Sequence, residues 1–191
     1  MPDPSPAAMD FLLTRRSRPA KTLEAPYPDQ ATLETLLTAA ARTPDHGALV
    51  PWRFVVLGKG ALERLAALAG TRGTALDLPE RDLGKGVSQF ADSGCAVAVI
   101  GSPKESAKVP QIEQTLSVGA ACYGLLSAAL ASGWGANWLT GWPAHDAEFG
   151  REGLSLGEEE YVAAFIHIGT ETAAPPERPR PDLSDIVTFL P

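Results

Sequence analysis

Four consecutive residues near the N-terminus form the densest basic feature of the sequence. Arg15, Arg16, Ser17 and Arg18 occur in a chain whose 16 Lys and Arg are outnumbered by 23 Asp and Glu, which gives a formal net charge of −7. Guanidinium groups offer paired donors to phosphate oxygens, and a serine adds a hydroxyl. The cluster therefore has two interpretations, a phosphate-binding clamp or the solvated charged end of a helix.

A second candidate is a proline-bounded turn that carries a histidine. Thr43-Pro44-Asp45-His46 runs into Pro51-Trp52-Arg53-Phe54. A loop of this composition can frame a flat ligand with its imidazole and aromatic rings. The same residues also make an ordinary tight corner, because Pro and Asp are common turn formers.

Other catalytic patterns fail on their context. Gly153-Leu-Ser155-Leu-Gly157 has the spacing of a hydrolase nucleophile elbow, but no strand is expected before it and no helix after it. Gly133-Trp-Gly135 lacks the third glycine of a dinucleotide fingerprint, and Gly84-Lys85-Gly86 lacks a Ser or Thr after its lysine. We therefore expect neither a serine nucleophile nor a glycine-rich phosphate loop.

The histidines and cysteines predict neither a metal site nor a disulfide framework. The three histidines have no metal-ligand spacing, and His167 lies in an apolar run typical of a core histidine. Cys95 and Cys122 also lie in apolar sequence, where buried reduced thiols are expected.

Length and charge limit the class of protein. A chain of 191 residues with 45% hydrophobic residues is typical of one globular domain, and the acidic balance disfavours a nucleic-acid binder. The N-terminus has no basic and apolar signal pattern, so we expect a cytoplasmic protein. Residues 114–145 include no Asp, Glu, Lys or Arg, but polar residues and Gly133 interrupt the apolar run, which favours a buried helix over a membrane span.

The elements that must position the candidates follow from periodicity and punctuation. Residues 1–8 are expected to be a disordered leader, and 9–191 a single domain. Residues 70–86 are expected to be a connection of undefined structure, and residues from 173 onward an extended Pro-rich tail with an apolar end that docks onto another subunit. We expect four helices: one over 9–13, one from an Asp29 cap to Thr43-Pro44, one over 61–69 and one over 110–132. We expect strands over 53–57, 95–100 and 161–168. Ala120, Gly124 and Ala128 leave one face of the long helix flat enough for close helix packing.

Six short motifs occur in an order that is typical of one family. They are Arg15-Arg16-Ser17, Ala41-Arg42-Thr43-Pro44-Asp45-His46 with Pro51-Trp52, Lys108-Val-Pro110-x-x-Glu113-Gln114, Gly133-Trp-Gly-Ala-Asn-Trp138, Ile168-Gly169-Thr170, and Arg178-Pro-Arg180-Pro with Leu183. From about residue 9 to its C-terminus, the chain resembles the FMN-dependent nitroreductase family, specifically its compact branch of short chains.

The resemblance implies an α+β fold with a mixed, largely antiparallel sheet flanked by helices, built as an intertwined homodimer with FMN at the subunit interface. It implies that Arg15 and Ser17 bind the phosphate and ribityl end of FMN, that Arg16 lies nearby on the flavin, and that Arg180 closes the phosphate site. Arg42 and His46 would reach the flavin from the partner subunit, and Trp138, Leu139 and Thr140 would line its ring. Leu139 and Val50 stand where relatives often have polar residues, which implies a more apolar pocket over the flavin.

The resemblance also implies an activity. NAD(P)H would pass a hydride to FMN, and a nitroaromatic, quinone or similar acceptor would then be reduced, with no protein nucleophile or general base required. Two alternatives stay open at this point: a flavin-binding or flavin-fragmenting protein on the same scaffold with little reductase turnover, and a scaffolding dimer whose basic cluster is solvated.

Overall fold

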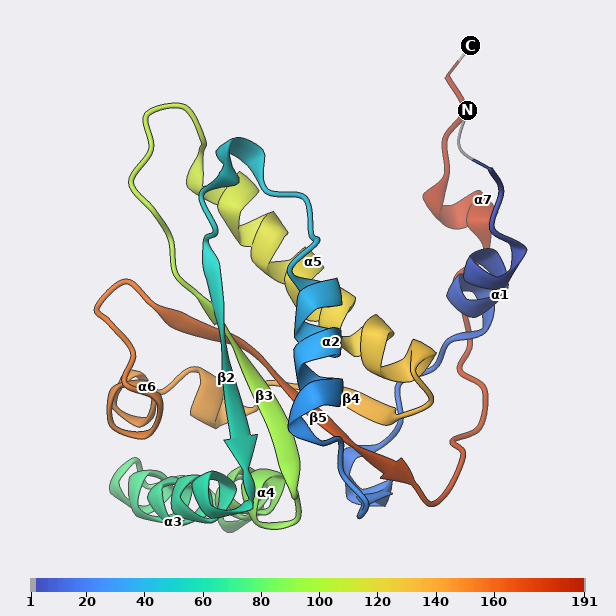
Figure 1. The fold of residues 1–191 in the computed structure, drawn as a ribbon. Coiled ribbons are helices and arrows are strands. Elements are labelled where there is room, and N and C mark those ends of the chain that lie inside the picture. The colour runs from blue at the N-terminus through green and yellow to red at the C-terminus, as the bar shows by residue number, and fades with distance from the viewer. Residues whose placement is uncertain (1–2, 191) are drawn as a thin grey trace.

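The computed structural model describes residues 3–190 and is built around an antiparallel sheet (Figure 1). Its strands are β1 (Leu23–Glu24), β2 (Trp52–Gly58), β3 (Cys95–Gly101), β4 (Gly135–Leu139) and β5 (Tyr161–Glu171). The order is β1-β5-β3-β2, with β4 also paired to β5, and all four pairings are antiparallel. The α+β class and the largely antiparallel sheet are confirmed, although these pairings include no parallel one.

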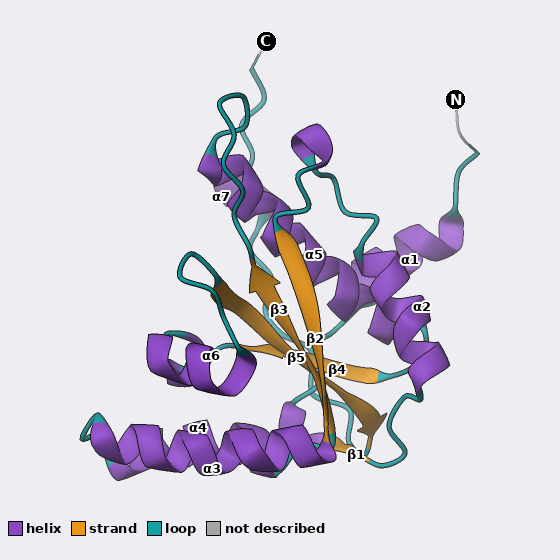
Figure 2. Ribbon diagram, turned by 60° about the vertical axis from the view of Figure 1, so that its left-hand side comes forward, coloured by secondary structure: helices purple, strands orange, loops and turns teal. Residues whose placement is uncertain are grey.

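Helices cover both faces of the sheet (Figure 2). On one face, α2 (Gln30–Ala40) and α5 (Gln111–Ala131) pack on alternate β3 residues such as Val97 and Val99. On the other face, α3 (Lys59–Ala75), α4 (Glu80–Ala91) and α6 (Ala147–Leu154) enclose the intervening residues such as Ala98 and Ile100. Every β3 residue is buried, which confirms the prediction of a central strand covered on both faces.

The sequence prediction for residues 70–86 is wrong. α3 continues to Ala75, and α4 begins at Glu80. Glycines inside both helices suggested a break, but tertiary packing requires two of them. A Cβ at Gly86 would lie 2.1 Å from the Trp142 indole nitrogen, and one at Gly73 would lie 3.2 Å from the Leu83 side chain.

Helix α5 confirms the predicted long helix to within a residue at each end, and Asp29 confirms its predicted cap by accepting from Thr32 N–H on α2 at 2.8 Å. The flat face of α5 is used inside the chain, because a Cβ at Gly124 would lie 3.3 Å from the Ala40 Cα on α2. A different surface of α5 carries the exposed side chains of Ile112, Leu116 and Tyr123. By length and composition α5 could cross a membrane, yet eight of its residues are buried in the chain.

The two terminal segments are α1 (Pro6–Thr14) and residues 173–190, which include the short α7 (Leu183–Ile186). Helix α1 begins within the predicted disordered leader, because Ser5 and Pro6 suit the start of a helix. Residues 1–2 of that leader and residue 191 lie outside the described residues. Neither α1 nor α7 has a buried residue, and both extend away from the sheet in Figure 1.

Candidate active site

The basic cluster is attached to the edge of the sheet through its last residue. The Arg18 backbone N–H donates to the Ala136 carbonyl at 2.8 Å, and the Asn137 side-chain amide donates to the Arg18 carbonyl at 2.6 Å. The segment that leaves α1 at Arg15 is therefore held beside β4. This attachment brings the cluster close to the strand that carries Trp138.

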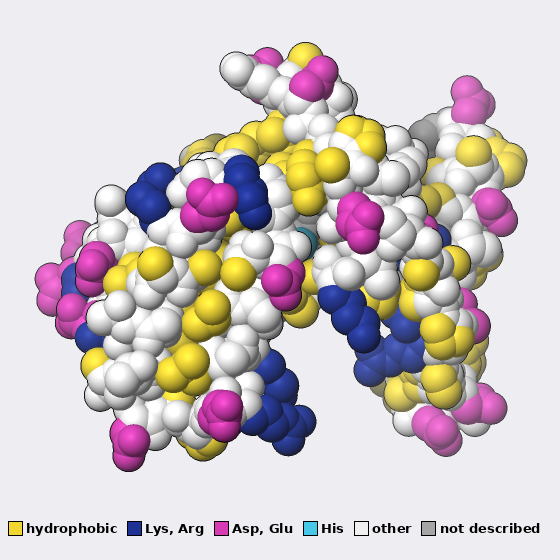
Figure 3. All heavy atoms as spheres, turned by 90° about the horizontal axis from the view of Figure 1, so that it is seen from below, with side chains coloured by type: hydrophobic (Ala, Val, Ile, Leu, Met, Phe, Trp, Pro, Cys, Tyr) yellow, Lys and Arg dark blue, Asp and Glu magenta, His cyan; other side chains and the backbone are white. Residues whose placement is uncertain are grey.

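Arg15, Arg16 and Arg18 line a cavity of about 230 Å³ together with Trp134 and Glu171. The Arg15 guanidinium donates to Ser17 Oγ at 3.2 Å, and Arg18 Nε lies 3.3 Å from a carboxylate oxygen of Glu171. Arg15 also lies over the Tyr123 ring of α5, 5.6 Å from its centroid. Figure 3 views the molecule from below and shows a hollow with Lys and Arg side chains on both of its walls.

The end of β4 faces two further cavities. Trp138 is 37% exposed. Leu139 lines a cavity of about 340 Å³ with Lys21, Lys85 and Gln89. Thr140 lines a larger one of about 540 Å³ against α5. The next residue turns the chain away at φ 64°, a conformation that favours the glycine found there, Gly141.

Sequence reasoning missed Lys85 and Gln89. Both lie on α4, in or next to the stretch that was predicted to be a connection. Apolar residues at Leu83, Val87 and Phe90 repeat with helical spacing, and this signal could have shown which side chains lie on the opposite face.

The tail contributes the last arginine of the predicted set. Arg180 donates to the Glu177 carboxylate at 3.1 Å. The Arg178 backbone N–H lowers the pKa of Glu177 most, and the guanidinium groups of Arg180 and Arg16 lower this pKa further. Arg180 and Arg16 therefore act on the same carboxylate, although Arg180 comes from the other end of the chain.

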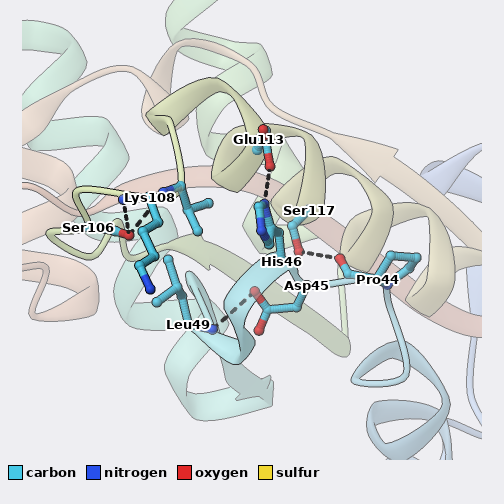
Figure 4. A network of polar contacts seen from close by, with 9 residues as sticks. Pro44, Asp45, His46, Leu49, Ser106, Lys108, Glu113 and Ser117 are labelled. Carbon is cyan, nitrogen blue, oxygen red and sulfur yellow. Dashed lines mark hydrogen bonds and ion pairs between the residues drawn. The ribbon is translucent and has the colours of Figure 1, made fainter.

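Arg42 and His46 lie elsewhere. Both residues follow α2, and His46 lies beside the first turn of α5, where its Nδ1 is 2.6 Å from a Glu113 carboxylate oxygen (Figure 4). Among the residues that the structure describes, neither side chain has a hydrogen bond or ion pair with Arg15, Ser17 or Trp138. Within the described part of one chain, no direct polar contact therefore joins Arg42 or His46 to the basic cluster.

Unpartnered polar atoms gather around the basic cluster. Within residues 3–190, six buried side-chain nitrogen or oxygen atoms have no hydrogen-bond partner. Three of them, Arg15 Nε, Arg16 Nε and a Glu171 oxygen, belong to the basic cavity, and Gln89 Nε2 belongs to the cavity beside Leu139. Because buried polar groups in proteins are nearly always paired, this concentration is typical of a site that binds a polar ligand.

Comparison with known proteins identifies the family. Residues 12–170 match the family model described as "Nitroreductase family". The chain belongs to this family. A Haemophilus influenzae protein named "Putative NAD(P)H nitroreductase" is 35% identical over 185 residues, which cover 96% of this chain and 99% of that protein.

Solved structures share the nitroreductase fold at lower identity. A nitroreductase-like family protein from Bacillus cereus superposes with a TM-score of 0.78 at 18% identity, over 100% of this chain and 98% of that one. A Clostridium difficile protein described as an FMN-dependent nitroreductase superposes with a TM-score of 0.65 at 21% identity, over 95% and 98% of the two chains. At these identities the two structures establish the fold alone.

The rejected motifs have structural roles in this nitroreductase-family chain. Ser155 follows α6 with φ 55° and is a helix cap, not a nucleophile elbow. Burial lowers the pKa of His167 to about 4 and raises the pKa of Cys95 and Cys122 to about 11 and 12. His167 is therefore a neutral core histidine that contacts Ser93 Oγ at 2.9 Å, and both thiols stay protonated. The described residues include no cluster of three potential metal ligands.

Proposed function

We propose that this chain is an FMN-dependent NAD(P)H oxidoreductase that reduces a nitroaromatic, quinone or similar acceptor. The observation that supports this proposal is the pair of unpartnered guanidinium nitrogens, Arg15 Nε and Arg16 Nε, in the cavity beside β4. When bound, FMN would supply the hydride chemistry that the protein's own side chains lack.

The residues fit the two chemical ends of FMN. Its phosphate carries a charge near −2 and needs charge-assisted donors, which Arg15, Arg16 and Arg180 offer along with the Ser17 hydroxyl. The flat ring would lie along residues 138–140. Its polar edge needs both donors and acceptors, and the Gln89 amide provides both kinds while Lys85 provides a cation in the adjoining cavity.

Arg42 and His46 make no polar contact with the basic cluster of their own described chain, and the resemblance to nitroreductases implies that a second copy of the chain supplies them to the site. We infer a homodimer in which these two side chains face the flavin site of the partner subunit. The chain has apolar surface that such a partner would cover. Leu116 of α5 and Leu13 of α1 are 66% and 78% exposed, and Phe189 in the tail is 92% exposed. Obligate interfaces of this kind bury on the order of 2,000–5,000 Å².

Two measurements test the function. Purified protein is incubated with FMN, excess flavin is removed, and the absorption spectrum is recorded. We expect bound flavin, and a protein that retains none would contradict the proposal. The second measurement is oxidation of NADH and NADPH in the presence of nitroaromatic and quinone acceptors. Bound FMN without acceptor-dependent turnover would favour a flavin-binding or flavin-fragmenting protein instead.

Sedimentation tests the dimer. At micromolar concentration we expect about twice the chain mass of 20.1 kDa. A monomer that still binds FMN tightly would contradict the shared site and leave the flavin proposal standing.

A further inference from the structure

The contact between His46 and Glu113 carries a further inference, which rests on the proposed function. The histidine and the glutamate are separated by 67 positions in the sequence, yet His46 Nδ1 lies 2.6 Å from Glu113 Oε2. An ionised carboxylate can only accept a hydrogen bond, so the contact requires the proton to be on Nδ1. Nε2, on the opposite side of the ring, is then the atom left to contact a ligand.

Hydrogen bonds to α5 hold the backbone around His46 in place (Figure 4). Ser117, one turn along α5 from Glu113, donates to the Pro44 carbonyl at 2.8 Å and accepts from the Trp52 indole at 3.2 Å. Helix α5 therefore fixes the loop at two points, with Ser117 at Pro44 and Glu113 at the imidazole.

The same loop is conformationally strained. Gly47, Ala48 and Val50 have φ values of 76°, 52° and 49°, a region that side chains such as valine rarely adopt. The Asp45 carboxylate stabilises this turn by accepting from the backbone N–H of Leu49 at 3.2 Å and of Val50 at 2.7 Å. A loop with this many constraints presents its histidine in one orientation.

We propose that Glu113 is a positioning residue that fixes the tautomer and orientation of His46, so that Nε2 faces the flavin site of the partner subunit. The His46 side chain is 61% exposed, which leaves Nε2 accessible to that partner. In both the neutral and the protonated ring, Glu113 occupies Nδ1. Glu113 itself touches neither flavin nor acceptor and acts only through His46.

A structural explanation of Glu113 makes a different prediction. Glu113 lies in the first turn of α5, where a negative charge stabilises the helix. If this charge were its whole role, Glu113→Gln and Glu113→Ala would have equal effects, because both remove the charge. The positioning role predicts unequal effects, because the glutamine side-chain oxygen can still accept from Nδ1–H and alanine cannot.

The test combines nitrogen NMR of the histidine rings with kinetics on the full-length chain. His46→Gln assigns the His46 signals among the three histidines. At a pH where the ring is neutral, we expect protonated Nδ1 in the wild type and in Glu113→Gln, and protonated Nε2 in Glu113→Ala. With FMN and a quinone acceptor, we expect kcat to fall about 10- to 100-fold in Glu113→Ala and to stay within about threefold of wild type in Glu113→Gln. Glu105→Gln, which changes an exposed acid nearby, is the matched control and should alter neither readout.

An unchanged tautomer in Glu113→Ala would overturn the inference, and so would a changed tautomer with unchanged turnover. Equal losses in both Glu113 variants would assign the residue to helix stability. Failure of the wild type to bind FMN in the absorption experiment would instead contradict the proposed function and the ligand-facing role of Nε2. In that case the NMR result would still report on the Glu113–His46 contact by itself.

Discussion

The same residue types have different surroundings in two regions of the molecule. One region is the sheet with its covering helices, and the other is the pair of terminal segments. Phe90, Phe149 and Phe165 have no exposed surface, whereas Phe189 is 92% exposed. Arg53 on β2 donates two hydrogen bonds to Glu160, at 2.8 and 2.6 Å, whereas Arg15 after α1 has a buried Nε without a partner. The sheet and its covering helices thus bury these phenylalanines and pair Arg53 within the chain, although a few other buried polar atoms there, such as Gln89 Nε2, lack a partner. We propose that the terminal segments use Arg15 to bind a ligand and Phe189 to contact a second copy of the chain.

Two matched phenylalanine substitutions test this difference, and one of them should have the largest effect on stability. Phe165 packs edge-on against Phe90 with ring centroids 5.0 Å apart. Phe165→Ala should lower the free energy of unfolding by about 3–5 kcal/mol, because it leaves a cavity in the core. Phe189→Ala should mainly weaken dimer association.

Urea denaturation at two protein concentrations, together with sedimentation, separates the two effects. Destabilisation by Phe165→Ala should persist at both concentrations. A loss of about 3 kcal/mol in Phe189→Ala that does not depend on concentration would show that the tail folds onto its own chain, contrary to the comparison.

Helix α5 carries both an exposed and a buried leucine, so the two environments can be compared on a single helix. Leu116 is 66% exposed, whereas Leu125 is fully buried against the sheet. Leu116→Asp should leave the fold intact and convert the dimer to a monomer, because it places a charge in the proposed interface. Leu125→Asp should prevent folding. Circular dichroism and sedimentation of both variants check this prediction, and a dimeric Leu116→Asp protein would exclude this face of α5 as the interface.

The dependence of the unfolding free energy on acidic pH compares two paired carboxylates, Glu160 beside the sheet and Glu177 in the tail. The two hydrogen bonds from Arg53 lower the pKa of Glu160 from an ordinary value of 4.5 to about 2. Because the folded-state pKa is the lower one, this pair stabilises the fold above about pH 4.5, and the contribution is lost as the pH falls toward 2. Glu160→Gln should cost about 1–3 kcal/mol at pH 7 and flatten stability over that acidic range.

Glu177 in the tail provides the control. Its pKa is also lowered, by the Arg178 backbone and by Arg180 and Arg16, but the carboxylate is exposed. Glu177→Gln should leave stability unchanged at every pH in the same denaturation series. A loss in Glu177→Gln as large as that in Glu160→Gln would show that the tail contributes to the fold of its own chain.

The sequence predicted best those elements whose pattern depends on local burial. The continuous apolar run at Cys95 predicted a central strand, and the uncharged stretch predicted α5, because an apolar composition is visible in the local sequence. The connection proposed for residues 70–86 was wrong, because Gly86 looks like a helix breaker in sequence. Only the Trp142 ring packed against it explains why a glycine is needed inside α4.

The sequence could predict which residues belong to the candidate site better than it could predict which of them lie close together. The density of positive charge from Arg15 to Arg18 identified the basic part of the site. The hydrogen bonds of Arg18 hold this part beside β4, the strand that carries Trp138. The sequence could not show that Gln89 joins it, because this depends on how α4 packs. Glu113 belongs to the motif that begins at Lys108, but its contact with His46 depends on a loop geometry that no local pattern indicates.

The most direct test of the central claim, that the Arg15 cluster binds the phosphate of FMN, is the ratio of the dissociation constants for FMN and riboflavin. Riboflavin lacks the phosphate. Arg15→Ala should weaken FMN binding about 10- to 150-fold, the equivalent of about 1.5–3 kcal/mol for a charge-assisted hydrogen bond, and leave riboflavin binding nearly unchanged. Arg64→Ala, which removes an exposed arginine on α3, is the matched control and should change neither constant. An unchanged FMN to riboflavin ratio in Arg15→Ala would contradict the account, even if the protein binds flavin.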